Sequence, residues 1–518
     1  MTSMPAVGRG VLRTDAYQVT MAQLYFRLGL HERRARFEHF YRSNPDYGEH
    51  QAGYCVTAGL GPFLDWASEA RATESDVAAL RAHRGRAGDP LFDDAFCDWF
   101  ADVDFGGLSI SAVPEGRVVH PNAPITVVEG SLGEAQLIET PLLNLLNFPT
   151  LIATKASRVV DVAHGRPVLE FGMRRGPASG ADDGSRAALI GGAVGTSNAA
   201  EGYRLGMPPS GTHAHSMVQL FMALGDGERG AFEAYADVYP DDCLLLVDTV
   251  DTLESGIPNA IAVFEQLRTR GHEPVGVRLD SGDLAYLAVQ SAKRLDAAGF
   301  PDASIVLSSD LDELRIWQIL QQIADEAPRS GIDADGVVGR LVFGVGSRLA
   351  SSHGDPSLDG VYKLVAVDDD GDWLPAMKLS DNPAKLLNPG PKRLWRLYDA
   401  EGTATADVLS TADEELRPGD DLVLHHHARN DLVRSLPGTR WSRAEELLLP
   451  VFADGRPTGP VDDPYVSVQA ARAWRDHDVA LLDPGVRRIV NPHVYHVSIT
   501  DALARVKAEQ IERFRRPD

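Results

Sequence analysis

The chain is poor in cysteine and in positive charge, and each shortage excludes a class of protein. Only three cysteines occur in 518 residues, at Cys55, Cys97 and Cys243. Three thiols cannot form the disulfide framework of a small secreted domain, so we expect a reducing, cytoplasmic compartment. The 50 Lys and Arg residues are outnumbered by 74 Asp and Glu residues, which gives a formal net charge of −24. A field of this sign repels nucleic acid and anionic membranes, so neither is expected as a partner.

Several signatures of well-known sites are also missing. The sequence has no Gly-x4-Gly-Lys-Ser/Thr loop, no Gly-x-Gly-x-x-Gly after a predicted strand, and no Cys-x2-Cys pair. These absences argue against a P-loop for ATP, a Rossmann dinucleotide site and a structural zinc site. Residues 1–17 lack the apolar region of a signal peptide. The most apolar stretch, 136–156, is interrupted by charged and proline residues, so it is expected as a buried helix and not as a membrane span.

Short apolar runs recur in the middle third, with helical patterns between them. From Asp248 onward their spacing is roughly 30 residues, the length of one βα unit. The runs end in polar or charged residues and cover 244–248, 275–280, 305–308 and 341–344. Such strands, buried on both faces, indicate a parallel sheet. We expect an α/β fold, an irregular (β/α) barrel that presents its site at the carboxyl ends of the strands.

The two ends of the chain are predicted to form a second, α+β lobe. Strand-like runs precede the barrel at 36–42 and 108–113 and follow it at 362–367 and 394–398, and a helical tail covers 500–514. We therefore expect an N-terminal lobe at 1–135 and a catalytic barrel at 136–359. A C-terminal segment at 360–518 would complete the lobe and pack on the barrel.

Three polar segments of the last third are expected as exposed loops. They are 368–372, 400–413 and the triplet His425-His426-His427. The triplet could bind adventitious metal, but no carboxylate or cysteine stands beside it, which favours a solvated loop.

The densest polar cluster runs from Gly191 to Ser216. Its first part, 191–198, is glycine-rich, so backbone N–H groups could approach an anion, although a plain tight turn fits as well. Its second part contains His213 and His215, which point the same way if the segment is extended. A metal pair, a catalytic histidine and a structural histidine all remain open at this point.

Two further clusters follow apolar runs directly. Arg278 and Asp280 project from the same side of a strand end, as a buried ion pair or as a ligand site. A guanidinium suits a carboxylate or phosphate, and the aspartates of 280–283 suit ribose hydroxyls or Mg²⁺. The segment Gly344-Val-Gly346-Ser347-Arg348 combines glycines and a hydroxyl in a manner typical of a phosphate cradle.

Two aromatic residues accompany these clusters. Tyr17 stands near a helix start for which Thr14 or Asp15 is a natural N-cap, and Phe171 precedes Arg174 and Arg175. Aromatic rings with guanidinium groups behind them could sandwich a flat anionic heterocycle, although packing explains the rings equally well.

Taken together, these segments resemble the nicotinate phosphoribosyltransferase family of type II phosphoribosyltransferases, from about Thr14 to Asp399. The matching motifs are Thr-Asp-x-Tyr-Gln from Thr14, Glu-Phe-Gly with Arg174 from Glu170, Gly-Thr-Ser-Asn at 195–198, Gly-Thr-x-Ala-His-Ser at 211–216, Arg-x-Asp-Ser-Gly-Asp-Leu at 278–284, Gly-Val-Gly-Ser at 344–347 and Gly-Val-Tyr-Lys-Leu at 360–364. The ending 491–498 also looks familiar. Seven motifs in this order are far more specific than any one of them.

The resemblance implies an enzyme of NAD salvage. Such an enzyme joins nicotinate to 5-phosphoribosyl 1-diphosphate with ATP hydrolysis, giving nicotinate mononucleotide and pyrophosphate. His215 would be the residue that ATP transiently phosphorylates. Asp280 would bind ribose hydroxyls or Mg²⁺, and Arg278 would hold the nicotinate carboxylate or the adjacent diphosphate.

The other implied substrate contacts are spread over the same motifs. Tyr17 and Phe171 would stack on the pyridine ring, and Gly344, Gly346 and Ser347 would take the 5′-phosphate. The remaining expected substrate-binding residues are Arg174, Thr196, Thr212, Ser216 and Asp283. The family resemblance also implies a homodimer with sites at the subunit interface.

Two alternatives remain, a nicotinamide phosphoribosyltransferase and a non-catalytic barrel that binds sugar phosphates. Relatives that use nicotinamide carry an Asp where this chain has Ser197, which leaves no negative charge to repel a carboxylate. Ser347 replaces the Thr of many members and keeps the hydroxyl. Because the expected substrates are anions, a local positive pocket from arginines and Mg²⁺ must lie within the acidic exterior; the candidates are Arg174, Arg175, Arg278 and Arg348.

Overall fold

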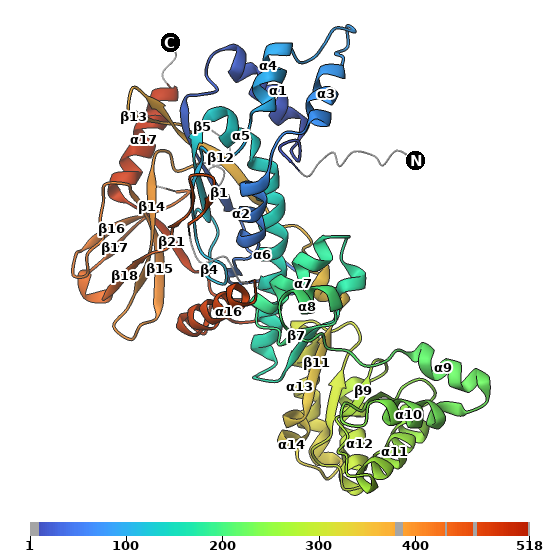
Figure 1. The fold of residues 1–518 in the computed structure, drawn as a ribbon. Coiled ribbons are helices and arrows are strands. Elements are labelled where there is room, and N and C mark those ends of the chain that lie inside the picture. Colours follow the sequence, from blue (N-terminus) through green and yellow to red (C-terminus); the bar gives the residue numbers. More distant parts are fainter. Residues whose placement is uncertain (1–9, 379–386, 430–431, 459–463, 516–518) are drawn as a thin grey trace. The chain divides into compact units, whose positions relative to one another are not determined.

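The computed structural model describes residues 10–378, 387–429, 432–458 and 464–515 (Figure 1). The chain divides into two compact units. Unit 1 comprises Met1–Leu151 and Ser357–Asp518, and unit 2 comprises Ile152–Pro356. The sequence placed the corresponding boundaries at 135 and 359, whereas the first observed boundary lies within helix α6, Glu139–Val162. Among the described residues, no helix combines the length and the apolar character needed to cross a membrane.

Unit 2 is built on a six-stranded sheet in the order β7-β6-β11-β10-β9-β8. Each neighbouring pair is parallel, which confirms the predicted α/β class. The strands are β6 (Val168–Glu170), β7 (Gly195–Thr196), β8 (Leu244–Leu246), β9 (Gly276–Leu279), β10 (Ser304–Leu307) and β11 (Leu341–Val345). Strands β7 and β8 are the two ends of this row, so the sheet is open in the described part of the chain.

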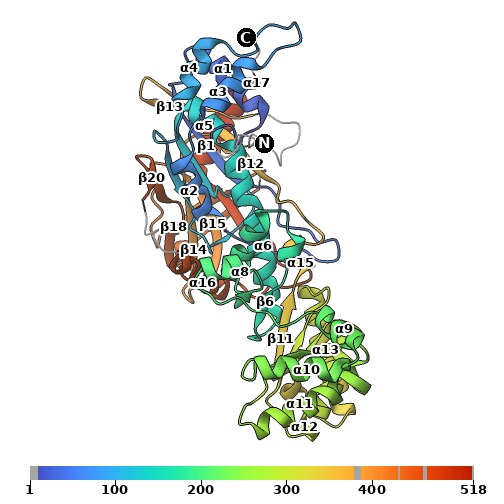
Figure 2. The ribbon, with the colours of Figure 1, turned by 45° about the vertical axis from the view of Figure 1, so that its right-hand side comes forward.

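Helices surround the strands of unit 2 in both views (Figures 1 and 2). They are η1 (Met173–Arg175), α7 (Gly180–Ile190), α8 (Ala199–Arg204), α9 (His215–Leu224), α10 (Gly227–Val238), η2 (Thr252–Gly256), α11 (Ile257–Thr269), α12 (Leu284–Ala297), α13 (Glu313–Arg329), α14 (Ala334–Gly339) and α15 (Ser347–Ala350). Helix α11 buries Ile257, Phe264 and Leu267 along one face, as its 3.6-residue periodicity predicts. Helix α12 ends before Gly299, whose φ of +82° suits a glycine just beyond a helix C-terminus.

Unit 1 contains two larger sheets and a short two-stranded one. The seven-stranded sheet has the order β13-β12-β1-β5-β3-β19-β20, and β1 pairs with both β5 and β12, so early and late parts of the chain share one sheet. Its strands are β1 (Arg34–Tyr41), β3 (Ser109–Ala112), β5 (Thr126–Ser131), β12 (Gly360–Asp369), β13 (Asp372–Pro375), β19 (Leu449–Ala453) and β20 (Arg456–Pro457).

The second sheet of unit 1 has the order β17-β16-β21-β15-β14-β18. Its strands are β14 (Lys392–Tyr398), β15 (Ala404–Thr411), β16 (Leu422–His426), β17 (Val433–Leu436), β18 (Arg443–Glu446) and β21 (His496–Thr500), and β2 (Cys55–Val56) pairs separately with β4 (Val118–Val119). The other elements of unit 1 are α1 (Ala16–Arg27), α2 (Leu60–Glu69), α3 (Glu74–Ala82), α4 (Asp94–Ala101), α5 (Leu132–Leu137), η4 (Gly438–Arg440), α16 (Pro464–Leu481) and α17 (Asp501–Arg515).

The prediction of an exposed loop is wrong for two of the three segments. Most of 400–413 forms strand β15, which lies between β14 and β21 and is buried along 406–410. Two residues of the histidine triplet, His425 and His426, belong to strand β16. Of the third expected loop, 368–372, only Asp370 and Gly371 form the turn between β12 and β13, both at positive φ, and the other three residues end or begin these strands.

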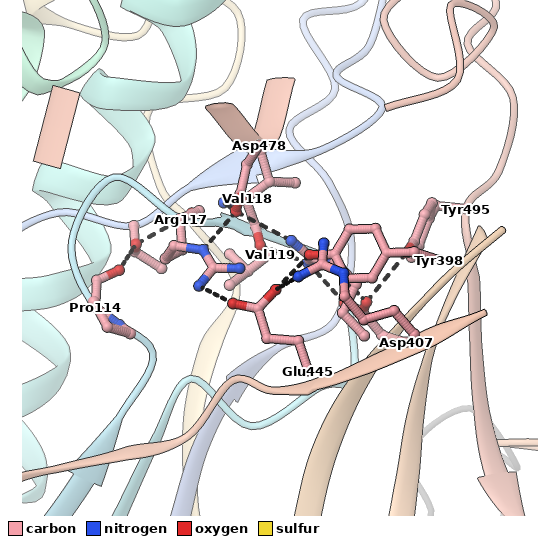
Figure 3. A network of polar contacts seen from close by, with 12 residues as sticks. Pro114, Arg117, Val118, Val119, Tyr398, Asp407, Glu445, Asp478 and Tyr495 are labelled. Atoms are coloured by element: carbon pink, nitrogen blue, oxygen red, sulfur yellow. Dashed lines mark hydrogen bonds and ion pairs between the residues drawn. The ribbon is translucent and has the colours of Figure 1, made fainter. Parts of the chain in front are cut away.

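Asp407, the charged residue of β15, belongs to a buried ion-pair network within unit 1 (Figure 3). Asp407 is fully buried and accepts two hydrogen bonds of 2.9 Å from the guanidinium of Arg396. Arg396 also contacts Asp478 at 3.1 Å, and Arg117 pairs with Asp478 and Glu445 at 2.8 Å each. The network therefore compensates charged side chains that, from composition alone, would be expected to face solvent.

Candidate active site

Strands β8 and β9 of unit 2 bring two carboxylates to one histidine. Asp280 follows β9 directly, and Asp248 lies two residues beyond the end of the adjacent strand β8. His215 is the first residue of α9, and its Nε2 lies 3.8 Å from Asp248 Oδ1 and 3.9 Å from Asp280 Oδ2. The structure therefore brings together His215 and Asp280, two of the expected site residues, and places Asp248, which the site prediction did not include, beside them.

The side chain of Asp248 is fixed by hydrogen bonds to one of its carboxylate oxygens, and the other oxygen has no hydrogen-bond partner among the described residues. Its side chain is 2% exposed, and its Oδ2 accepts from Ser281 Oγ at 2.6 Å and from the Asp280 N–H at 3.2 Å. Its Oδ1 is buried and meets no hydrogen-bond partner among the described residues. This oxygen is available to an imidazolium or to a cation. The position of Asp248 at the end of the neighbouring apolar run was the sequence signal that could have found it.

Arg278, Asp280 and Ser308 form one hydrogen-bonded group. Arg278 donates from Nε to Ser308 Oγ at 2.9 Å and from Nη2 to Asp280 Oδ1 at 3.2 Å. Ser308 also donates to Asp280 Oδ1, so this carboxylate oxygen has two donors. Arg278 and Asp280 are 17% and 28% exposed, and so the ion pair is partly open to a ligand.

Ser308 begins a strained turn after β10. The next two residues, Ser309 and Asp310, have φ of +96° and +52°, which side chains other than glycine rarely adopt. Such strain is common where a backbone is held for function. Ser308 was missing from the sequence prediction because it is a plain serine at the end of an apolar run, one strand along from Asp280.

Phe171 follows β6 directly, and its ring lies against Gly344, the first residue of the expected phosphate loop. Arg278 Cζ lies 5.4 Å from the centre of the Phe171 ring, within the range of a cation–π contact. A Cβ atom on Gly344 would lie 2.5 Å from Phe171 Cε2. Glycine at 344 therefore lets the ring lie against β11, which is a packing role for this residue.

Replacing Gly344 with alanine is expected to displace the Phe171 ring. The added methyl group needs space that the ring occupies, and overpacking of this kind costs about 1–3 kcal/mol. We expect a lower thermal unfolding midpoint together with a raised KM for the aromatic substrate. Gly339→Ala is the matched control, because nothing lies within 4 Å of a Cβ there. Equal midpoints and equal KM values for the two variants would contradict the packing role.

Thr196 is committed to the turn that contains it. It is buried, donates to Glu170 Oε2 at 2.6 Å and accepts from the Asn198 N–H at 3.0 Å. Glu170 also accepts from Ser185 Oγ at 3.0 Å and from the Gly172 N–H. These contacts favour a positioning role for Thr196, with Glu170 as the residue that holds the turns after β6 and β7 together.

His213 and His215 have different surroundings. His213 Nε2 accepts the Leu246 N–H at 3.1 Å, so this ring holds β8 in place. Burial lowers the pKa of His213 to about 4, with further lowering from Arg278 and His215. His213 is therefore neutral at physiological pH and engaged with the backbone, whereas Nδ1 of His215 has no hydrogen-bond partner among the described residues.

The pKa of His213 gives a pH dependence of stability. Since the folded pKa is about 4 and the ordinary value is 6.5, the unfolded chain binds this proton more readily between these values. The contribution of His213 to the free energy of unfolding is therefore complete above pH 6.5 and is lost as the pH falls toward 4. We expect His213→Gln to lose less of its unfolding midpoint between pH 7 and pH 5 than the wild type. Identical losses would show that His213 is not buried as a neutral ring.

The other expected residues have varied positions. Thr212 is half-buried, and Ser216 is exposed on α9. Arg174 and Arg175 are exposed on η1. The Asp283 side chain caps α12 by accepting from the Tyr286 N–H. Gly346 and Ser347 are half-buried at the start of α15. Arg348 pairs with Asp312 at 2.7 Å and Asp310 at 3.1 Å, so its charge is already compensated. Tyr17 lies on α1 of unit 1 and is 51% exposed.

Comparison with known proteins gives a consistent set of similarities. The model of the nicotinate phosphoribosyltransferase N-terminal domain matches residues 12–147, and that of the C-terminal domain matches residues 391–507. Nicotinate phosphoribosyltransferase of Bacillus subtilis is 36% identical over 504 residues, which cover 96% of this chain and 95% of that protein. A nicotinate phosphoribosyltransferase of Mycobacterium tuberculosis is 35% identical over 498 residues, covering 95% of this chain and 92% of that protein.

The similarity extends to solved structures. The crystal structure of human nicotinic acid phosphoribosyltransferase has a TM-score of 0.79 and 29% identity, over 96% of this chain and 99% of that one. Nicotinate-nucleotide pyrophosphorylase from Pyrococcus furiosus shares the fold, with a TM-score of 0.63 and 20% identity over 92% of this chain and 97% of that one.

Proposed function

Because this chain belongs to the nicotinate phosphoribosyltransferase family, we propose that it joins nicotinate to 5-phosphoribosyl 1-diphosphate with ATP hydrolysis. The products are nicotinate mononucleotide and pyrophosphate, and the reaction serves NAD salvage. The observation that carries this function is the placement of His215 against Asp248 and Asp280, beside the group formed by Arg278 and Ser308. This arrangement supplies a nucleophile, two carboxylates and a guanidinium at the carboxyl ends of adjacent parallel strands.

His215 is proposed as the residue that ATP phosphorylates. With a proton on Nε2, which faces Asp248 and Asp280, the lone pair of Nδ1 is uncommitted; because Nδ1 is buried, the ring must turn toward ATP before it attacks. The bond from Nδ1 to the γ-phosphorus forms as the bond from this phosphorus to the β–γ bridging oxygen breaks, and ADP leaves with that electron pair. The two carboxylates balance the positive charge that the ring acquires.

Arg278 and Phe171 are proposed to hold the nicotinate. Arg278 would pair with the carboxylate of nicotinate or with the adjacent diphosphate, and Phe171 would stack on the pyridine ring. The Arg278–Phe171 contact already places a guanidinium beside an aromatic face. Ser197 is neutral and half-buried next to this turn, so no charge there opposes a carboxylate.

Mg²⁺ is proposed as the metal of this reaction, and the carboxylates fit its chemistry. No group of three or more His, Cys, Asp or Glu side chains in the described part of the chain has the arrangement of a protein-only metal site. Mg²⁺ is usually held by one or two carboxylates together with substrate phosphates. The buried, unpartnered Oδ1 of Asp248 and the half-open Asp280 meet this requirement. The metal would neutralise the charge of the diphosphate group.

The remaining contacts belong to the same scheme. Backbone N–H groups near Gly346 and the Ser347 hydroxyl would bind the 5′-phosphate, with Gly344 keeping the loop open to Phe171. Arg174, Thr212, Ser216 and Asp283 would contact the phosphoribosyl group or ATP. Tyr17 is 51% exposed on α1, and the proposed homodimer, with sites at its subunit interface, is the setting in which its ring would stack on the pyridine.

Two coarser features complete the proposed function. The parallel sheet of unit 2 would be the larger part of an irregular (β/α) barrel. The three cysteines are free and buried, as suits a reducing cytoplasm.

The choice of base tests this function directly. The purified chain is supplied with 5-phosphoribosyl 1-diphosphate, ATP, Mg²⁺ and equal concentrations of nicotinate and nicotinamide, and the nucleotide products are separated by mass. We expect nicotinate mononucleotide to predominate, and Ser197→Asp to reduce its share because a carboxylate would then face the carboxylate of nicotinate. Preference of the wild type for nicotinamide would refute the proposed substrate, and the absence of any nucleotide product would favour a non-catalytic protein.

A further inference from the structure

Unit 1 contains a cavity of about 480 Å³ that the reaction does not use. We call it the histidine pocket. It is defined by Arg42, His426, His427, Arg434, His493 and His496 among its lining residues. Two segments that the sequence singled out, the histidine triplet and the 491–498 motif, meet at this cavity. All of the lining residues belong to unit 1, whereas His215, Arg278 and Asp280 belong to unit 2.

The described lining contains two arginines and no carboxylate, although the chain is acidic. The chain has 74 Asp and Glu residues, yet none stands among the described residues that line the pocket. The lining instead supplies two guanidinium groups and five imidazoles, together with the hydroxyls of Ser43 and Ser498 and the amides of Asn44 and Asn122. Burial lowers the pKa of His427 to about 4 and also lowers the pKa of His120 and His496, so these three rings are neutral, with one N–H donor and one acceptor nitrogen each. The lasting positive charge of the lining therefore comes from its two guanidinium groups.

A further cation stands behind the pocket wall. Lys507 is buried, and its Nζ donates to the His427 carbonyl at 2.6 Å and to Asn388 Oδ1 at 3.0 Å, both of which are neutral. Burial and the nearby Lys392 lower the pKa of Lys507 to about 8, so it is still mainly charged at neutral pH. Its charge contributes to a positive potential at His427.

The opposite wall is aromatic. The ring of His120 is fully buried and stacks on Tyr495, with centroids 3.7 Å apart and planes within 11°. Behind this pair, Tyr495 donates to Asp407, the carboxylate that Arg396 already neutralises (Figure 3). Asp407 is therefore compensated by Arg396. Of the lining residues, Arg42 lies 3.7 Å from Asp359 and His493 lies 3.9 Å from Asp483, so part of the positive charge of the lining is shared with carboxylates outside it.

We propose that the histidine pocket binds a phosphorylated small molecule of mononucleotide size, at a site separate from the reaction centre. A cavity of about 480 Å³ lies within the usual range for small-molecule sites and is far larger than an inorganic ion requires. Arg42 and Arg434 carry guanidinium groups, whose planar fork of donors suits a phosphate group. Leu432, Val433 and Val494, which are exposed apolar residues of the lining, supply a surface for the organic part of the ligand.

Calorimetric titration with AMP and with ribose 5-phosphate tests this site. We expect the full-length wild type to bind one equivalent at this pocket, in addition to any binding at the 5′-phosphate loop of the reaction centre. The pocket event should survive in Arg278→Gln, because Arg278 belongs to the reaction centre. In the double variant Arg42→Gln/Arg434→Gln, both of whose arginines are partly exposed, the affinity should fall at least about tenfold. Arg440→Gln removes an exposed guanidinium of unit 1 that lies outside the pocket lining, and it should bind like the wild type.

The controls separate the possible failures. The double variant should retain the unfolding midpoint and the kcat of the wild type, which excludes loss of binding through misfolding. Loss of AMP and ribose 5-phosphate binding in Arg278→Gln would assign both ligands to the reaction centre and overturn the separate site. Unchanged affinity in the double variant would also overturn the separate site. So would the failure of both compounds to bind the wild type. None of these results bears on whether the chain makes nicotinate mononucleotide.

Discussion

Replacement of His215 with alanine is expected to abolish phosphorylation of the protein by ATP. With labelled ATP, the wild type should acquire an acid-labile phosphoryl group and His215→Ala should acquire none, because the variant lacks the Nδ1 lone pair. Stimulation of nucleotide formation by ATP should disappear with the label. The measurements are the stoichiometry of acid-labile label and the rate of nicotinate mononucleotide formation with and without ATP.

His213→Gln is the matched control for this prediction. His213 lies two residues away, but its Nε2 accepts the Leu246 N–H, and a glutamine oxygen can replace that acceptor. The control should therefore keep both the label and the response to ATP. Label that persists in His215→Ala, or that is lost only in His213→Gln, would place the phosphoryl group on another residue.

Replacement of Asp280 with asparagine is expected to reduce kcat/KM by a factor on the order of 10²–10³, the loss usual for one preorganised electrostatic group. Asp280 faces His215 Nε2 at 3.9 Å and also accepts from Arg278 and Ser308. An amide carries no charge to balance a phosphorylated imidazole ring, and if its oxygen keeps the Arg278 and Ser308 donors, its NH₂ group replaces the oxygen that faces His215. Steady-state rates with nicotinate and 5-phosphoribosyl 1-diphosphate measure the effect.

Asp251→Asn supplies the comparison for Asp280→Asn. Asp251 follows the same strand as Asp248 but caps η2, accepting from the Leu253 and Glu254 N–H groups. Asparagine caps helices about as well as aspartate, so this variant should stay within about twofold of the wild type. If both variants lose activity equally, the loss reflects damage to the loops and not the charge of Asp280.

The sequence predicted the strands of unit 2 well, because burial on both faces leaves a clear signal. Each apolar run between Val168 and Gly344 corresponds to an observed strand, and the polar residue that follows lies at the carboxyl end. It did not reveal Asp248 or Ser308 as site residues, because their role depends on which strands are neighbours. Only the observed order β10-β9-β8 places Asp248, Asp280 and Ser308 side by side.

Strand β15 was missed for a different reason. Small, polar and charged side chains are mixed along its sequence, which is typical of a loop in an acidic chain. The charge of Asp407 is instead buried against Arg396 from β14, a partner 11 residues away that composition cannot reveal. The histidine triplet was misread in the same way, since the neighbours that line its cavity come from distant parts of the chain: residues 42–53 and 120–122, strand β17 and the 491–498 segment.

The net charge of −24 is informative about partners only at long range. Among the expected basic residues of the reaction centre, Arg348 is paired with two aspartates, and Arg278 shares Asp280. Under the proposed function, capture of anionic substrates would therefore depend on local contacts and on the proposed Mg²⁺ rather than on long-range attraction.

Release of pyrophosphate by the wild type, measured as an initial rate, tests the proposed reaction most directly. The assay contains 5-phosphoribosyl 1-diphosphate and Mg²⁺, with nicotinate, nicotinamide or no base, each with and without ATP. We predict release that requires nicotinate and increases with ATP. Release that requires nicotinamide, or that occurs with nicotinate but shows no response to ATP, would contradict an ATP-coupled nicotinate phosphoribosyltransferase.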